Sequence, residues 1–445
     1  MIFKISTLKN KNFLALTGNL VISGFSVITM SLLYRAFSKS DAGTWFFFLS
    51  IQSLAEAFRG GLLSTAAVKF YAGTEKKIAE TVIGTIWLAS LAITCILLIG
   101  SIIGICFIKY ITNYQLIIVL KWIGITFVSS LSFTVPIWVL MADENYAKIL
   151  WLRLVNSGSM FLTIIVLIYF KRMTLDNMLI LNIATNVLTG IVCVLMGSFY
   201  IEYLFKSTKA KFIEILHFGK FTVSSGISLI FFRTFITIII TFFLSPTALA
   251  VYNLPGRLMT IIEIPLGSSL GTGMSAMATA LNKNKIHDFK KIFVKYTGLL
   301  TFAILPIILF VLLFADYAVA IIGGPKYNGT EAANILRLMI FFSFLFPLDR
   351  FNGVALDLLH LPHINFQKIL IMLSVNTIGG LLGLYFFHSL YGIAFFTPLT
   401  VISGVLFGYY ALKKRMDYTI VEIIQSGCYE TKNVFLKIKK SARMK

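Results

Sequence analysis

The chain has 445 residues, of which 58% are hydrophobic and only 13% are charged, and its mean hydropathy is +0.88. Lys and Arg number 39 against 18 Asp and Glu, so the net charge is +21. This balance excludes a soluble enzyme and indicates a protein with many membrane-spanning segments. Nucleic acid is not expected as a partner, because the basic residues stand between apolar runs rather than on one domain.

Long apolar segments follow one another along the chain. Each has about 20 residues or more, which suits a membrane-spanning helix and not the strands of about 10 residues in a membrane barrel. The basic and then apolar start of the chain is interpreted as a retained first helix. We expect an all-α integral membrane protein of about twelve transmembrane helices, at 13–34, 43–68, 80–108, 114–141, 146–170, 175–201, 218–243, 247–275, 292–323, 332–359, 364–388 and 390–412.

Basic residues concentrate in every second connection between these segments. If the N-terminus is inside, the inside connections hold far more Lys and Arg than the outside turns, even without the C-terminal tail. Lys148 and Lys368 are counted among these inside residues. Since cytoplasmic loops keep positive charge, both termini are predicted to be cytoplasmic.

Two parts of the chain recur. Residues 34–65 align with 241–272 without a gap, and residues 145–156 align with 365–376. The polar residues that coincide are Ser38/Ser245, Glu56/Glu263, Thr65/Thr272, Asn145/Asn365, Lys148/Lys368 and Asn156/Asn376. A duplicated half is therefore predicted.

The copies lie six predicted helices apart. An even number of spans gives both halves the same direction, so we expect two parallel six-helix bundles around a central cleft, an architecture typical of transporters. The tail could lie on an anionic membrane surface or be solvated without a specific role. The expected domains are an N-terminal bundle at 1–205, a C-terminal bundle at 206–415 and a basic cytoplasmic tail at 416–445.

Charged residues inside apolar segments are the candidate functional groups. An ionisable side chain in the membrane costs at least about 2.5 kcal/mol, so it is expected to face a wet cavity or a partner. Arg233 is in the middle of its segment, and the alternative to a cavity position is a structural arginine bound to a carbonyl. Its helical face also carries Thr222, Ser225, Gly226, Thr237 and Thr241, a polar stripe typical of a cavity wall.

The two matched acids have different neighbours. Glu56 and Arg59 are three residues apart and share a face, so they are either functional or a neutralised pair that packs the bundle. Glu263 has no basic residue at this spacing. It must find a partner on another helix or be protonated, because burial raises the pKa of a carboxyl group. Glu263 is therefore the better candidate for binding a proton or cation.

Two further arginines complete the set. Arg257 follows Pro255-Gly256, where the helix is expected to bend. Arg350 shares a face with Asp357, so a neutralised cluster is the alternative there. The predicted cavity has more arginine than acid, and arginine suits bidentate binding of phosphate. An anionic, phosphate-bearing substrate is thus favoured over a cationic drug.

The remaining residues offer no sign of catalysis. The four Cys and five His are scattered, without the spacing of a metal site, and no nucleotide-binding loop or catalytic triad spacing occurs. No cofactor or metal is expected, and the chain is not expected to be an enzyme.

Several segments are similar to one family. They are LYRAFSKSDAGTWFFFLS, FGKFTVSSG, FFRTF, LSPTALAVYNLPGRLM and IIGGPKYNG. The chain resembles the bacterial oligosaccharide flippases of the O-antigen and exopolysaccharide branch. Their superfamily also contains multidrug exporters and the lipid II flippase. The resemblance covers most of residues 10–415.

The resemblance implies transport of undecaprenyl-pyrophosphate-linked oligosaccharide across the bacterial cytoplasmic (inner) membrane for O-antigen, capsule or exopolysaccharide synthesis. We further expect alternating access between the two halves, with an H+ or Na+ gradient that biases the cycle through Glu56 or Glu263. Membrane lipids, a polysaccharide polymerase and chain-length proteins are the other expected partners. The expected substrate-binding residues are Arg59, Arg233, Arg257 and Arg350, and the expected ion-coupling residues are Glu263 and Glu56.

Two other functions stay open. A multidrug or cation exporter of the same superfamily would have a cavity dominated by acids. A polysaccharide polymerase or ligase would have a large outside loop, and no predicted outside connection is long enough for one.

Overall fold

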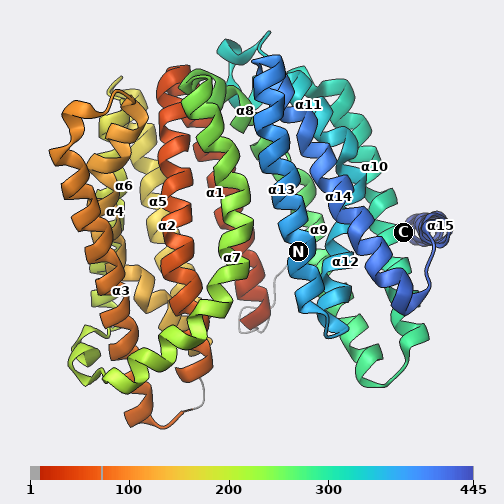
Figure 1. Cartoon of the computed structure of the whole chain (residues 1–445), viewed down its shortest axis with the longest axis horizontal. Coiled ribbons are helices and arrows are strands. Elements are labelled where there is room, and N and C mark those ends of the chain that lie inside the picture. The colour runs from red at the N-terminus through yellow and green to blue at the C-terminus, as the bar shows by residue number, and fades with distance from the viewer. Residues whose placement is uncertain (1–10, 72–73, 444–445) are drawn as a thin grey trace. The chain divides into compact units, whose positions relative to one another are not determined.

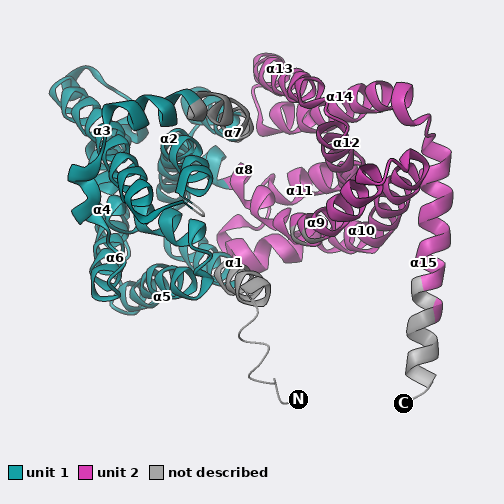
Figure 2. Cartoon of the chain, turned by 90° about the horizontal axis from the view of Figure 1, so that it is seen from below, with its two compact units in different colours: residues 1–250 teal, residues 251–445 magenta. Residues whose placement is uncertain are grey.

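The computed structural model describes residues 11–71 and 74–443. Side chains are described from residue 24 onward, except for 218–229, Phe232, Arg233, Ile264, Ser268, 434–435 and 437–443. Every regular element in the described residues is a helix (Figure 1), which confirms the all-α prediction. The chain divides into two compact units, Met1–Ala250 and Val251–Lys445 (Figure 2).

Unit 1 contains the first seven long helices. They are α1 (Lys11–Ala36), α2 (Lys39–Tyr71), α3 (Lys76–Cys106), α4 (Tyr114–Ala142), α5 (Tyr146–Tyr169), α6 (Leu175–Leu195) and α7 (Lys209–Phe243). Two 3-10 turns, η2 (Ile108–Tyr110) and η3 (Ile201–Lys206), lie between them. The core packs around Trp87, Trp138 and Ile86.

Unit 2 follows from α8 (Pro246–Leu258), which contains the boundary. Its other elements are α9 (Thr260–Asn282), α10 (Ile286–Gly323), η4 (Pro325–Tyr327), α11 (Ala332–Phe341), η5 (Phe342–Leu345), α12 (Phe346–Leu358), α13 (Pro362–Phe387), α14 (Leu390–Met416) and α15 (Ile420–Arg443). Its core gathers the rings of Phe289, Phe293, Phe351 and Tyr418.

All twelve predicted segments coincide with helices. Eight described helices are long and apolar enough to cross a membrane, namely α3–α6, α10, α11 together with α12, α13 and α14. The chain is therefore a multi-pass membrane protein. The other four predicted spans correspond to α1, α2, α7 and α8 with α9, and their crossing stays a prediction.

Two of the predicted spans are broken, and a third, 292–323 in α10, has a kink at Phe314. One breaks at Met259, between α8 and α9, close to the expected bend at Pro255-Gly256. The other changes to a 3-10 turn at Phe342–Leu345, just before Pro347. Pro347 stands in the first turn of α12, where its missing N–H removes no helical hydrogen bond, whereas Pro255 lies within α8 and the break follows it by four residues.

The matched serines begin equivalent helices. Ser38 Oγ accepts a hydrogen bond from Asp41 N (3.0 Å) at the start of α2, and Ser245 Oγ accepts one from Ala248 N (3.0 Å) at the start of α8. Serine is a favoured N-cap because its oxygen satisfies a free N–H of the first turn. The repeat therefore marks the same boundary in both copies.

The helix α7 packs along α2, which places it in unit 1. Thr234 Oγ1 donates to Ser50 O (3.5 Å), and the rings of Phe47 and Phe242 are 6.2 Å apart. The predicted domain boundary at 205/206 lies between the two copies of the sequence repeat. The two compact units are divided at 250/251 instead, because α7 packs with unit 1. The boundary between the repeats stays a prediction.

Close backbone contact joins α13 to α14. A Cβ on Gly383 would be 2.3 Å from Gly392 O, and a Cβ on Gly392 would be 2.1 Å from Gly383 O. Small residues at such crossings let membrane helices approach, which is the main source of their packing energy.

Gly392→Leu is expected to separate α13 from α14 and to destabilise the protein by about 1–3 kcal/mol, the usual cost of overpacking. Gly271→Leu on α9 is the matched control, because no atom lies within 4 Å of a Cβ there. Size-exclusion chromatography after heating in detergent measures both. Equal heat stability of the two variants would contradict the close contact.

Candidate functional site

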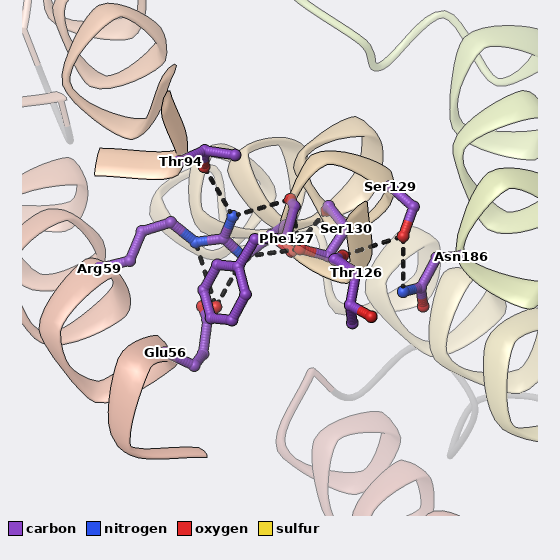
Figure 3. Close-up of polar contacts among 9 residues, drawn as sticks. Glu56, Arg59, Thr94, Thr126, Phe127, Ser129, Ser130 and Asn186 are labelled. Carbon is purple, nitrogen blue, oxygen red and sulfur yellow. Dashed lines mark hydrogen bonds and ion pairs between the residues drawn. The ribbon is translucent and has the colours of Figure 1, made fainter. Parts of the chain in front are cut away.

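Arg59 lies on α2 and is completely buried in unit 1. Nε and Nη2 donate to Glu56 Oε2 at 3.1 and 2.6 Å. Nη1 donates to Thr94 Oγ1 and to the Phe127 carbonyl, both at 3.3 Å, and Nη2 also donates to Ser130 Oγ at 2.8 Å (Figure 3). These five bonds match the five N–H groups of a guanidinium. The group is therefore fully bonded within unit 1.

The ring of Phe127 adds a further contact. The guanidinium carbon lies 4.6 Å from its centroid, a cation–π distance. A burial this complete is costly for a charge unless a counter-charge and hydrogen bonds accompany it, and both are present here.

Glu56 is the accessible member of the pair. Its side chain is 38% exposed, whereas that of Arg59 is 1% exposed. Gly60 leaves room beside the carboxylate, because a Cβ there would be 3.3 Å from Glu56 Oε1. A ligand that reaches this pair therefore meets a carboxylate oxygen rather than the guanidinium.

More buried polar groups extend from this pair across unit 1. On α4, Ser129 lies beside Ser130 and accepts a hydrogen bond from Asn186 Nδ2 of α6 (3.1 Å). Asn156 of α5 donates to Asn186 Oδ1 (3.3 Å) and to Thr189 Oγ1 (3.1 Å). Polar groups from five helices, α2 to α6, thus gather in an otherwise apolar bundle, and such residues mark functional sites by default.

Sequence reasoning singled out only part of this polar set. Asn156 coincides with Asn376 in the repeat, but Thr94, Ser130 and Asn186 were not candidates. A signal for α6 existed in the helical spacing of Asn182, Thr185, Asn186 and Thr189, all of which are buried.

Unit 2 contains a different buried ion pair. Lys368 Nζ of α13 donates to Asp349 Oδ1 of α12 (2.8 Å) and to the backbone carbonyl of the same residue (2.9 Å). The two side chains are 5% and 9% exposed. The Lys368 amine is therefore buried in the protein rather than solvated, and its predicted place on the cytoplasmic side of the membrane stays a prediction.

The matched lysine of unit 1 has neutral partners. Lys148 Nζ donates to Ser198 Oγ (2.8 Å) and to the Met196 carbonyl (3.2 Å), just after α6 ends. Both lysines thus tie their own helix to a neighbouring segment. The repeat thus coincides with a lysine that makes such a contact in each unit.

The other predicted arginines lie apart from these pairs. Arg257 is exposed in the last turn of α8, and Arg350 is exposed on α12. Asp357, the expected partner of Arg350, instead accepts hydrogen bonds from Asn365 Nδ2 at 3.0 Å. Arg233 is on α7, and its side chain lies outside the described residues.

Glu263 is half-buried in the first turn of α9, directly after the break at Met259. A negative charge is favoured at this end of a helix. Its repeat counterpart Glu56 lies in the middle of the unbroken α2. The two acids therefore differ in their surroundings: Glu56 pairs with Arg59 in the middle of a helix, and Glu263 lies at the start of one. In the described part of the chain, no cluster of His, Cys, Asp or Glu could hold a metal ion.

The fold is that of multi-helix membrane transporters. The structure is similar to an inward-facing MATE multidrug resistance transporter of the MOP superfamily (TM-score 0.69, 15% identity, 88% of this chain and 95% of that chain). It is similar to the lipid II flippase MurJ in an inward closed conformation (TM-score 0.74, 13% identity, 94% and 91%). A MOP superfamily transporter from Pyrococcus furiosus also matches (TM-score 0.60, 15% identity, 94% and 100%).

At these identities the similarity establishes the fold alone. A family model described as "Polysaccharide biosynthesis protein" matches residues 16–332, and the chain belongs to this family. No curated protein sequence matches the chain. The family and the fold confirm the resemblance found in the sequence.

Proposed function

We propose that the chain is a flippase that moves undecaprenyl-pyrophosphate-linked oligosaccharide across the bacterial cytoplasmic membrane. The observation that carries this proposal is the family match over residues 16–332 in a chain with a transporter fold. One of the proteins with that fold is a lipid II flippase, so the fold suits a substrate with a lipid tail. The glycan is one used for O-antigen, capsule or exopolysaccharide.

The exposed arginines Arg257 and Arg350, together with Arg233, are proposed to bind the pyrophosphate and sugars. Guanidinium groups suit this task because they bind phosphate oxygens in a bidentate manner. Arg59 has a different proposed role. Its N–H groups are already bonded, so it positions Glu56 and does not contact the substrate in this conformation.

Glu56 and Glu263 are proposed to take up and release the coupling ion, H+ or Na+. For Glu56 the support is a partly exposed carboxylate backed by a buried cation. An alternating-access cycle driven by the ion gradient would follow.

Arg233→Glu and Arg350→Glu are each expected to lower surface glycan by about tenfold or more, because a hydrogen bond to a charged group contributes about 1.5–3 kcal/mol. Complementation of a deletion strain measures this, with protein level determined by immunoblot. Arg172→Glu, exposed between α5 and α6, is the control. Normal glycan in both test variants would refute the arginine role. Lipid-linked oligosaccharide that accumulates in the deletion strain identifies the substrate.

A cation exporter of the same fold is the second candidate, and the partly exposed carboxylate of Glu56 is the observation that favours it. Efflux of cationic dyes from cells without their own pumps separates the two functions. Efflux without any glycan defect would replace the flippase proposal.

A further inference from the structure

The C-terminal helix α15 lies crosswise on α10. Figure 1 shows α15 end-on beside helices that run lengthwise, and Figure 2 shows it along its length. A Cβ on Gly298 of α10 would be 2.4 Å from Ile423 O, and one on Gly427 of α15 would be 2.6 Å from Gly298 O. The two backbones therefore touch at Gly298 and Gly427.

Both acids of α15 are bound to lysines of α10. Lys290 Nζ is 3.0 Å from Glu422 Oε1, and Lys295 Nζ is 3.1 Å from Glu430 Oε1. No other Asp or Glu occurs in the sequence Ile420–Arg443. The remaining charged residues of this segment are all basic, namely Lys432, Lys437, Lys439, Lys440 and Arg443.

The connection before α15 is fixed to the core of unit 2. Tyr418 is completely buried, and its hydroxyl donates to Asn352 Oδ1 (3.1 Å). Its ring lies 4.9 Å from that of Phe293 and 5.3 Å from that of Tyr409, between ring centroids. Lys290 also donates to the carbonyl of Asp417 (2.7 Å). The start of α15 is thus held in one place.

One stripe of α15 is apolar and uncovered. Ile420, Ile424 and Cys428 follow one another at a spacing of four residues and are all exposed, as is Val421. At 3.6 residues per turn these side chains lie on one side of the helix. Apolar side chains with basic residues on the same helix are typical of helices that lie in a membrane interface.

The crossing is at the level where such an interface is expected. The part of α10 from Ile286 to the kink at Phe314 alone spans about 42 Å at 1.5 Å per residue, beyond the hydrocarbon thickness of about 30 Å. Its charged residues Asp288, Lys290, Lys291 and Lys295 precede Gly298, and an apolar run follows it up to Asp316. The contact at Gly298 therefore lies near the change from charged to apolar sequence.

We propose that α15 is an interfacial helix that binds the anionic headgroups of the membrane leaflet at this end of unit 2. The apolar stripe enters the leaflet, and the exposed Lys432, together with the positive charge of the sequence that follows it, attracts the lipid phosphates. Two features favour an anionic membrane surface over a protein partner. The helix α15 crosses α10 where the sequence of α10 changes from charged to apolar, and the charged residues of α15 other than the paired Glu422 and Glu430 are all basic. Because the C-terminus is predicted to be cytoplasmic, the leaflet that α15 binds is the inner one.

The test uses the purified full-length chain in lipid vesicles. Cys95, Cys106 and Cys428 are replaced by Ser, and Ile424→Cys or Tyr429→Cys receives an environment-sensitive fluorophore. Both positions are exposed, but only residue 424 is in the middle of the apolar stripe. The label at 424 is expected to show blue-shifted emission and quenching by lipids with a spin label near the headgroup, and the label at 429 much less. Equal, water-like emission at both positions would overturn the proposal.

The lipid composition tests the charge. Replacing about a third of the phosphatidylcholine by phosphatidylglycerol is expected to increase the quenching at 424 by about twofold or more, as basic residues near an anionic surface attract it. Lys432→Gln, Lys439→Gln and Lys440→Gln together are expected to remove this increase. An unchanged increase would overturn the anionic-lipid assignment. The measurement needs no transport, so its failure is distinct from failure of the proposed flippase function.

Discussion

Lys368→Met is expected to destabilise the protein by about 3–5 kcal/mol, the cost of breaking a buried ion pair. The substitution leaves the Asp349 carboxylate buried without its counter-charge, since Lys368 supplies both a 2.8 Å contact to Oδ1 and a hydrogen bond to the carbonyl. Unfolding in mixed detergent micelles measures the free-energy change.

Two controls separate this effect from a loss of packing. Asp349→Asn combined with Lys368→Met removes both charges and is expected to recover most of the stability. Lys148→Met removes the matched lysine of unit 1, whose partners are neutral and leave no buried charge behind, so a smaller cost of about 1.5–3 kcal/mol is expected. If the two lysine variants lose the same stability, the buried pair has no special role.

Glu56→Gln is expected to abolish glycan export and to lower the yield of folded protein. Its carboxylate is the counter-charge of Arg59, a completely buried guanidinium, and an unpaired buried charge costs several kcal/mol. Chromatography of the purified variant measures folding, and complementation of a deletion strain measures export.

The double variant Glu56→Gln with Arg59→Gln separates folding from function. Removing both charges is expected to restore folded protein but not export, because the proposed coupling ion would then have no titratable group at this position of α2 to bind. Normal export by the double variant would show that the pair only packs the bundle. A neutralised pair that only packs the bundle is the alternative that the i,i+3 spacing of Glu56 and Arg59 also allows, and this measurement decides between the two.

The two halves use their matched residues differently. The serines at the starts of α2 and α8 have the same capping role, but Glu56 lies within a continuous helix and Glu263 in the first turn after a break. Lys148 contacts neutral groups and Lys368 a carboxylate. A duplicated chain thus keeps helix boundaries while the polar contacts diverge.

The helices, their order and their duplication could be predicted from the sequence, because each depends on the hydropathy and capping of neighbouring residues. The same local reasoning found Glu56 and Arg59 and expected a bend near Pro255. It also showed that the C-terminal tail is basic with apolar residues between the charges.

Only the tertiary structure decided which polar groups meet. The partners of Arg59 come from α3 and α4, and Lys368 finds Asp349 on another helix, at sequence separations that no local pattern encodes. The docking of α15 on α10 depends on two glycines that are 129 positions apart, 427 − 298. The physical reason is that hydropathy determines whether a segment becomes a helix, whereas its rotation and its neighbours depend on packing summed over many weak contacts.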